Sequence, residues 1–114
     1  MIDDEFISFY EEKIAGRPII TNMDKKVFSD MQSRYGLTEN RLTMLLVLEH
    51  FSRLVNQPKT IDELTKMSDN QLISYAKRLI ALYSKNLDDT QKETLKDDFL
   101  ALLKRKSQQQ NNLD

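Results

Sequence analysis

Five consecutive apolar residues near the middle of the chain constrain its fold more than any other feature. Met44 to Leu48 reads Met-Leu-Leu-Val-Leu. On a helix, five successive side chains point in every direction, so neighbouring elements must cover this segment on more than one side. We therefore expect a central buried helix over about residues 38–56. Leu46→Asp should be among the most damaging single changes, because it buries an unpaired charge.

The scarcity of turn residues favours helices for the rest of the chain. Its 114 residues include two glycines and two prolines, whereas sheets with tight hairpins usually need more of both. Apolar residues at helical spacing, separated by capping residues and glycine stops, divide the chain into five or six helices. The predicted fold is an all-α, compact bundle in a single domain, residues 1–106. We interpret the polar stretch 107–114 as a flexible tail.

Short-range signals predict where individual helices begin and end. The first helix is expected over Asp3–Ala15, with Asp3 as its cap and Gly16 as its stop. The second is expected to open at Thr21 or Asn22 and to carry an apolar stripe that ends at Tyr35. Two Ser/Thr-x-x-Glu/Gln capping boxes and one similar Asp-x-x-Gln signal predict three further helix starts, at Thr60, Ser68 and Asp88.

Charge and cysteine usage exclude several functional classes. The net charge is −1, so no bulk electrostatic field draws the chain to nucleic acid or to an anionic membrane. The absence of cysteine excludes disulfides, thiolate metal sites and cysteine nucleophiles. The acidic start and the lack of a long apolar run argue against export and against a membrane span. We expect a cytoplasmic protein that does not bind membranes.

No constellation in the sequence suggests catalysis. The single histidine, His50, falls inside the central helix, and we interpret it as a polar residue at the margin of the core. Adjacent carboxylates such as Glu11 and Glu12 diverge on a helix, so we assign them to solvated faces rather than to a metal site. No glycine-rich loop could cradle a phosphate. We therefore predict a protein that is not an enzyme and that uses no cofactor and no metal.

One stretch resembles a helix-turn-helix. Residues 60–82 give a short helix, a turn and a longer helix, and they follow a Leu-Thr-Glu-Asn-Arg-Leu segment at 37–42. This arrangement is similar to winged-helix regulators of the MarR and SarA kind. The resemblance implies a transcription regulator that contacts DNA through five residues: Asn70, Gln71, Ser74, Lys77 and Arg78.

Three features favour a plain helical hairpin over the DNA-binding alternative. The Glu63-Leu64 pair lies about three residues too near the second helix for the usual motif. No pair of alternating strands that could form a wing follows Leu79. The balanced charge also lacks the basic excess of a domain that grips phosphates. In this interpretation, Lys77 and Arg78 are simply solvated.

Our leading hypothesis is a non-enzymatic regulator or adaptor that binds a protein partner. It rests on an apparent excess of large apolar residues over what six short helices can bury. Aromatic residues at the edges of helical stripes are enriched at interfaces, and a homodimer is the most ordinary way to cover them. An immunity or inhibitor protein is a further alternative of the same architecture. The candidate interface residues are Phe9, Tyr10, Tyr35, Tyr75 and Tyr83.

Overall fold

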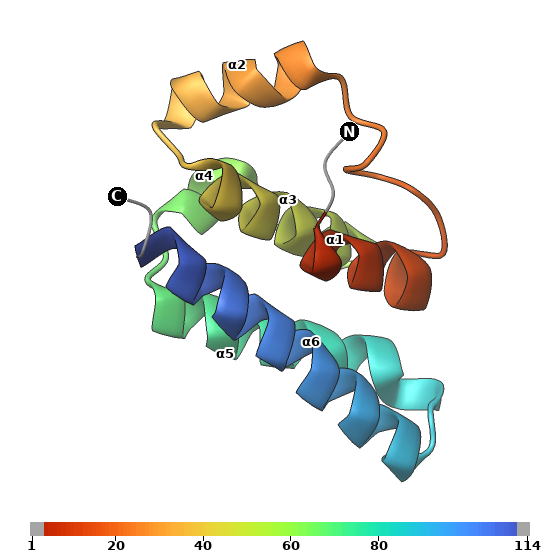
Figure 1. Cartoon of the computed structure of the whole chain (residues 1–114). Coiled ribbons are helices and arrows are strands. Elements are labelled where there is room, and N and C mark those ends of the chain that lie inside the picture. The colour runs from red at the N-terminus through yellow and green to blue at the C-terminus, as the bar shows by residue number, and fades with distance from the viewer. Residues whose placement is uncertain (1–3, 112–114) are drawn as a thin grey trace.

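A computed structural model describes residues 4–111 of the chain and the side chains of residues 4–108 (Figure 1). Within this range the chain is helical, without strands, which confirms the predicted all-α fold. Its elements are α1 (Glu5–Tyr10), the π-helix η1 (Glu11–Ala15), α2 (Lys25–Tyr35), α3 (Glu39–Leu54), α4 (Ile61–Thr65), α5 (Asp69–Tyr83), the 3-10 turn η2 (Ser84–Asn86) and α6 (Asp89–Asn111).

Helix α3 is the centre of the bundle, as the apolar run predicts. All residues from 42 to 48 are buried, and α3 contacts each of the other five α-helices. Thr38 caps its first turn by accepting a hydrogen bond from the Arg41 amide at 3.1 Å. The helix is therefore fixed by a local cap at its start and by apolar packing along its length.

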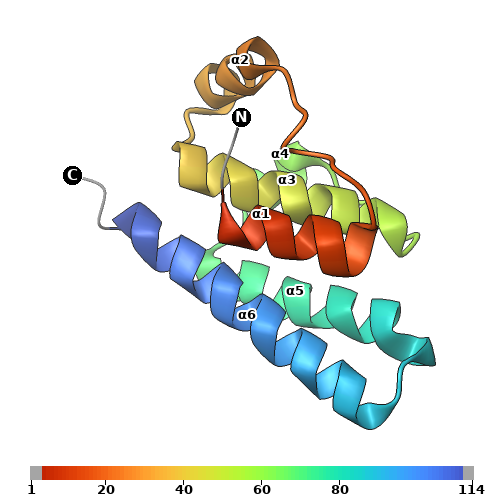
Figure 2. The ribbon, with the colours of Figure 1, turned by 45° about the vertical axis from the view of Figure 1, so that its right-hand side comes forward.

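The helices form three levels that both ribbon views show. Helices α1 and α3 run through the middle, α5 and α6 lie side by side on one side of them, and α2 lies on the opposite side of α3 (Figures 1 and 2). Phe51 of α3 and Phe99 of α6 form the aromatic centre of the core, with ring centroids 5.6 Å apart in an edge-to-face arrangement. Such pairs add to the stabilisation from burial alone.

The first helix begins one residue later than expected and ends where expected. The carboxylate of Asp4 accepts hydrogen bonds from two amides of the first turn, whereas Asp3 lies outside the described residues. Gly16 has a φ of 75° and its amide donates to the carbonyl of Glu11 at 2.8 Å. The left-handed stop predicted at Gly16 is therefore confirmed.

The predicted start of the second helix at Thr21 or Asn22 is wrong. The cap is Asp24, whose carboxylate accepts hydrogen bonds from the amides of Lys26 and Val27. Thr21 instead belongs to the connection before α2, where both its amide and its hydroxyl donate to the Glu11 carboxylate.

Two further boundaries differ from the sequence prediction. Leu54, expected on the buried face of the central helix, is 41% exposed because the helix ends there. The polar segment from residue 107 does not begin a tail, since α6 continues to Asn111 and Ser107 is buried. Lys106 holds this end of α6 against the bundle through Asp4 and Asn40. Residues 112–114 lie outside the described range.

The capping signals between residues 60 and 91 are confirmed. Thr60 with Glu63 and Ser68 with Gln71 form complete capping boxes at the starts of α4 and α5. Asp88 and Gln91 exchange the same pair of bonds at the start of α6. These caps fix where α4 and α5 begin, and so they position the turn between the two helices.

Candidate functional site

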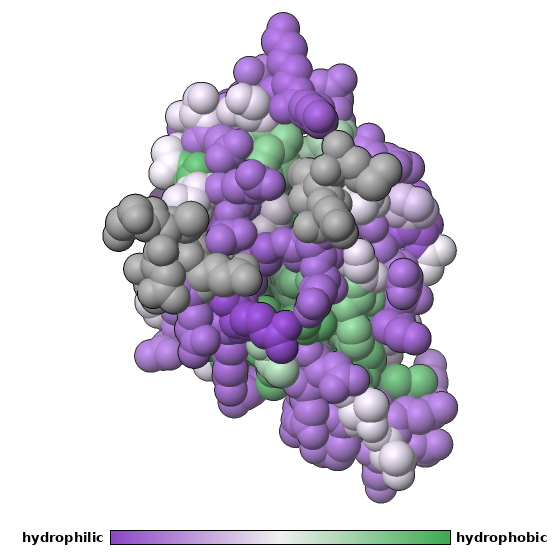
Figure 3. All heavy atoms as spheres, in the orientation of Figure 1, coloured by the Kyte–Doolittle hydropathy of each residue, from purple (hydrophilic) through white to green (hydrophobic). Residues whose placement is uncertain are grey.

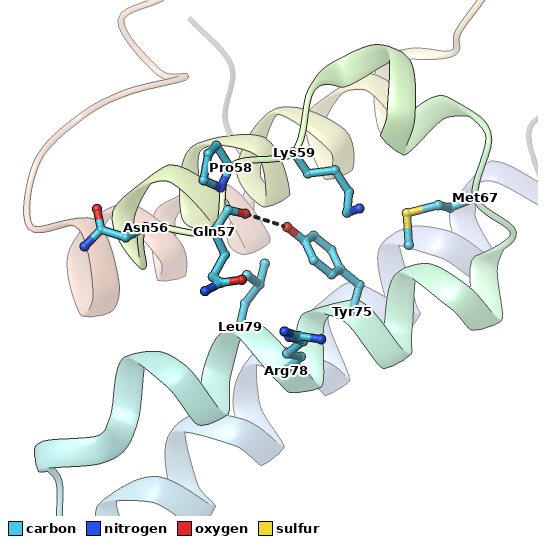
Figure 4. Close-up of a pocket in the computed structure, with 8 residues that line it drawn as sticks. All are labelled: Asn56, Gln57, Pro58, Lys59, Met67, Tyr75, Arg78 and Leu79. Atoms are coloured by element: carbon cyan, nitrogen blue, oxygen red, sulfur yellow. Dashed lines mark hydrogen bonds between the residues drawn. The ribbon is translucent and has the colours of Figure 1, made fainter.

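A surface groove lies where the loop after α3 folds back against α5 (Figure 4). It consists of two adjoining hollows of about 430 and 460 Å³ that share Lys59 and Met67. We call this surface the α5 groove. Its lining residues are Asn56, Gln57, Pro58, Lys59, Met67, Asn70, Gln71, Ser74, Tyr75, Arg78 and Leu79.

One wall of the groove is a loop with a defined conformation. Asn56 takes the left-handed conformation with a φ of 60°, which asparagine tolerates better than most residues. The Gln57 amide donates to the Ser52 carbonyl at 2.9 Å, and the Asn56 amide donates to the Arg53 carbonyl at 3.1 Å. This pair of bonds is the Schellman pattern of a helix end. The loop is therefore held by the last turn of α3.

Buried Ser52 fixes the other end of the loop. Its hydroxyl donates to the Glu49 carbonyl at 2.7 Å and accepts from the Lys59 amide at 3.1 Å. The side chain has no exposed area, so these bonds form away from competing water. Both ends of the loop are hydrogen-bonded to α3. The loop therefore has a defined conformation, and the groove is preformed.

Tyr75 joins the loop to the opposite wall. Its hydroxyl donates to the Gln57 carbonyl at 3.4 Å, and the Lys59 ammonium lies 5.3 Å from its ring centroid (Figure 4). Burial raises the pKa of Tyr75 above its ordinary value, and the phenol is a hydrogen-bond donor at neutral pH. Met67 and the buried Leu79 line the same hollow. The groove thus combines apolar and aromatic surface with a polar rim.

The groove takes up four of the five residues predicted to contact DNA. Asn70, Gln71, Ser74 and Arg78 line it, whereas Lys77 does not. All five are exposed on α5. The amide oxygen of Gln71 is already occupied by the Ser68 amide at 2.8 Å. The residues predicted to contact DNA therefore form much of the α5 wall of the groove.

Three of the five predicted interface aromatics belong to the core and its rim. Tyr10 has no exposed area, so in this fold it does not lie at a surface, and the prediction is corrected for this residue. Phe9 packs against Phe99, and Tyr83 packs edge-on against Phe51. Both are half-buried, as residues at the rim of a core are. Their stripe-edge positions reflect packing inside the bundle.

The other two interface candidates differ in their surroundings. Tyr75 is half-buried in the α5 groove. Tyr35 is half-buried at the end of α2, on the other side of the bundle. Tyr75 is therefore the one of the five candidate interface residues that lines the groove.

The expected excess of exposed apolar residues is not found. Among the residues described, the exposed large hydrophobics are Val27 and Leu54, at 50% and 41%. On the face shown in Figure 3, hydrophilic side chains predominate and hydrophobic ones show mainly between them near the centre. The case for partner binding must therefore rest on the shape and chemistry of the groove.

His50 lies at the edge of the core, as predicted. It is 8% exposed, and its Nδ1 lies 2.5 Å from the Tyr10 hydroxyl. Burial lowers the pKa of His50, and the nearby cations Arg53 and Arg17 lower it further. Within the described part of the chain, no group of three or more His, Cys, Asp or Glu side chains could hold a metal ion.

Glu11 is a buried carboxylate, not the solvated one that we predicted. One of its oxygens accepts the amides of Ile19 and Ile20 at 2.7 Å each and that of Thr21 at 3.1 Å. Burial alone would raise the pKa of Glu11, but the hydrogen bonds from the Thr21 hydroxyl and these amides outweigh it and lower the pKa. Glu11 therefore organises the connection to α2 and is structural.

Six lining residues of the groove are not among the predicted site residues: Asn56, Gln57, Pro58, Lys59, Met67 and Leu79. In the sequence, Pro58 marks an irregular segment, and Met67 and Leu79 fit apolar helical spacing, but neither pattern identifies the element against which the segment folds. Within the described residues, every helix is too short or too polar to cross a membrane. Comparison with protein-family models, with curated proteins and with solved structures found no match. The proposals below therefore rest on the geometry of this chain.

Proposed function

We propose that this chain is a non-enzymatic regulator or adaptor that binds a protein partner in the α5 groove. The observation that carries the proposal is the preformed groove itself, in which Tyr75 of α5 donates a hydrogen bond to the loop. Interfaces concentrate their binding energy on aromatic and arginine side chains in pockets that exist before the partner arrives. Tyr75 and Arg78 supply both residue types on adjoining turns of one helix.

A rigid groove favours binding because little conformational entropy is lost on association. The loop is tied to α3 at Gln57 and at Lys59, so ordering it costs the complex little. A toxin or an enzyme held in an inactive state would be one kind of partner, as the immunity or inhibitor alternative supposes. A second copy of this chain would be another.

Two matched tyrosines test the proposal. Tyr75→Ala should weaken capture of the partner from a lysate of the native host by about tenfold or more, as loss of a central aromatic does. Tyr35→Ala, also half-buried but on α2, should leave capture unchanged. Thermal melts of both variants would show that each is folded. Equal loss in both variants, or capture that ignores Tyr75, would contradict a role for the groove.

Light scattering over a range of concentrations tests the homodimer directly. A mass twice the chain mass of 13.4 kDa, reduced to the single-chain mass by Tyr75→Ala, would make a second copy the partner. A concentration-independent mass of one chain would exclude a second copy as the partner.

The exposed face of α5 favours one other function, that of a helix-turn-helix-like transcription regulator that binds DNA through residues 60–82. This face carries five exposed residues, four of which also line the groove: Asn70, Gln71, Ser74, Lys77 and Arg78. Salt-sensitive retention on heparin or random DNA, lost in the double variant Lys77→Glu with Arg78→Glu, would support this function. The absence of any wing strand among the described residues and the net charge of −1 favour the protein partner.

A further inference from the structure

We propose that the segment bound in the α5 groove is acidic: an apolar side chain flanked by aspartate or glutamate. This inference rests on the proposed function and adds the chemistry of the partner. The charged residues that line the groove are Lys59 and Arg78, and no carboxylate lines either hollow. A groove whose charges share one sign selects partners of the opposite sign.

The positive charge of the groove is only partly neutralised by the chain itself. Within the described residues Arg78 forms no ion pair, and Lys59 has one contact with a carboxylate, Glu63, at a long 3.9 Å. The nearby Asp69 is held by Arg41 at 2.7 Å instead. The guanidinium and the ammonium are therefore available to a partner's carboxylates, Arg78 as a two-pronged donor.

The apolar part of the recognition lies between these two charges. Tyr75 and Leu79 line the same hollow as Lys59 and Arg78, and the four side chains converge from the loop and from α5 (Figure 4). Met67 extends the apolar surface into the second hollow. An apolar side chain resting on Tyr75 would bring neighbouring carboxylates within reach of both cations. Charge alone would not require this spacing, so the apolar anchor is part of the inference.

Two neighbouring residues of α5 provide a matched test. Arg78 and Lys77 are consecutive and exposed, yet only Arg78 lines the groove. A library of random linear peptides displayed on phage would be selected against the full chain. The enriched peptides would then be synthesised with a fluorescent label, both as selected and with Asp and Glu replaced by Asn and Gln. Their affinities would be measured by anisotropy for the wild type, Arg78→Glu and Lys77→Glu.

The expected result separates the two variants. Enriched peptides should combine acidic and apolar residues, and neutralising their acidic residues should weaken binding by about tenfold or more. Arg78→Glu should produce a similar loss, whereas Lys77→Glu should change affinity by less than about threefold. Melting curves of both variants would confirm that the fold is retained.

The other outcomes overturn the inference in distinguishable ways. Enriched peptides without acidic residues that still lose affinity in Tyr75→Ala would refute the acidic partner and leave the groove's function standing. No enrichment at all would count against the acidic segment and the proposed function together. Salt-sensitive binding of a random DNA duplex, weakened equally by Lys77→Glu and Arg78→Glu, would assign the face of α5 to nucleic acid instead.

Discussion

The apolar residues of α2 form a single stripe in the sequence, whereas those of α3 point in every direction, and the structure buries the two helices to very different extents. Most of α3 is buried, including every residue from 42 to 48. In α2 only Phe28 is buried, and Val27 is 50% exposed. The two helices differ in how many neighbours cover them, since α3 lies between other helices on both sides and α2 lies on an outer side of α3.

This difference shows that an apolar stripe predicts a helix but not how much of the stripe is buried or how firmly the helix is held. The free energy that holds a helix in the bundle increases with the apolar area that it removes from water. This area is large around α3 and small under α2. Local opening draws on the weakly buried elements first. The α5 groove is built on the firmly held side, because its loop is tied to the last turn of α3.

The largest effect should come from a charge placed in the well-covered helix. Leu46→Asp should cost about 4 kcal/mol or more of unfolding free energy, because an unpaired carboxylate is buried. Leu54→Asp is the matched control on the same helix, and at an exposed position it should cost less than about 1 kcal/mol. Urea denaturation of both variants measures the pair. Equal losses would contradict the central position of α3.

A smaller and local effect should follow loss of the anchor of α2. Burial of phenylalanine is usually worth about 3 kcal/mol or more, but Phe28→Ala cannot cost more than the free energy that holds α2 on α3. We expect a global loss below about 3 kcal/mol. Hydrogen exchange should quicken in residues 25–35 and stay unchanged in α3 and α5. Faster exchange throughout the chain would show that α2 is not a separable unit.

The connection that leads into α2 should depend on one carboxylate charge. Glu11→Gln keeps the shape of the side chain and should cost about 1–2 kcal/mol at neutral pH. Glu12→Gln, next to it and exposed, should cost nothing measurable.

The pH dependence of this difference has a definite sign. The pKa of Glu11 is lowered from 4.5, so its contribution to stability is present above that pH and lost as the pH falls through the lowered value. The difference in unfolding free energy between the wild type and Glu11→Gln should therefore disappear at acidic pH. A stability difference that persists at low pH would mean that the charge of Glu11 does not organise the connection to α2.

The smallest effect concerns His50 on α3. Its pKa is lowered from 6.5, chiefly by burial, so the neutral ring favours the folded state. Stability should be complete above pH 6.5 and fall slightly as the pH drops through the lowered pKa. An NMR titration of the ring should give a pKa below 6.5. A value above it would contradict the burial of the ring against Tyr10.

Features set by neighbouring residues could be predicted from the sequence, and features set by distant ones could not. Five adjacent apolar residues define the central helix, and the boxes at Thr60 and Ser68 act within one turn. The start of α2 was missed because Thr21 serves a carboxylate ten residues earlier. Tyr10 was misplaced because its partner, His50, comes from another helix.

The α5 groove shows the same division. The polar residues on α5 could be recognised from helical spacing, which placed Asn70 and Arg78 on one exposed face. The loop wall could not be predicted, because Gln57 and Lys59 reach their places through bonds with Ser52 and Tyr75. A helical pattern contains no information about which loop closes over it.

The most direct test of a preformed groove is residue-resolved hydrogen exchange by NMR on the free protein. The amides of Gln57 and Lys59, bonded to Ser52, should exchange more slowly than the amides in the middle of α2, although they belong to a loop. That order would show that the wall of the groove is in place before any partner binds. Exchange of Gln57 and Lys59 as fast as in an unstructured peptide would contradict the account.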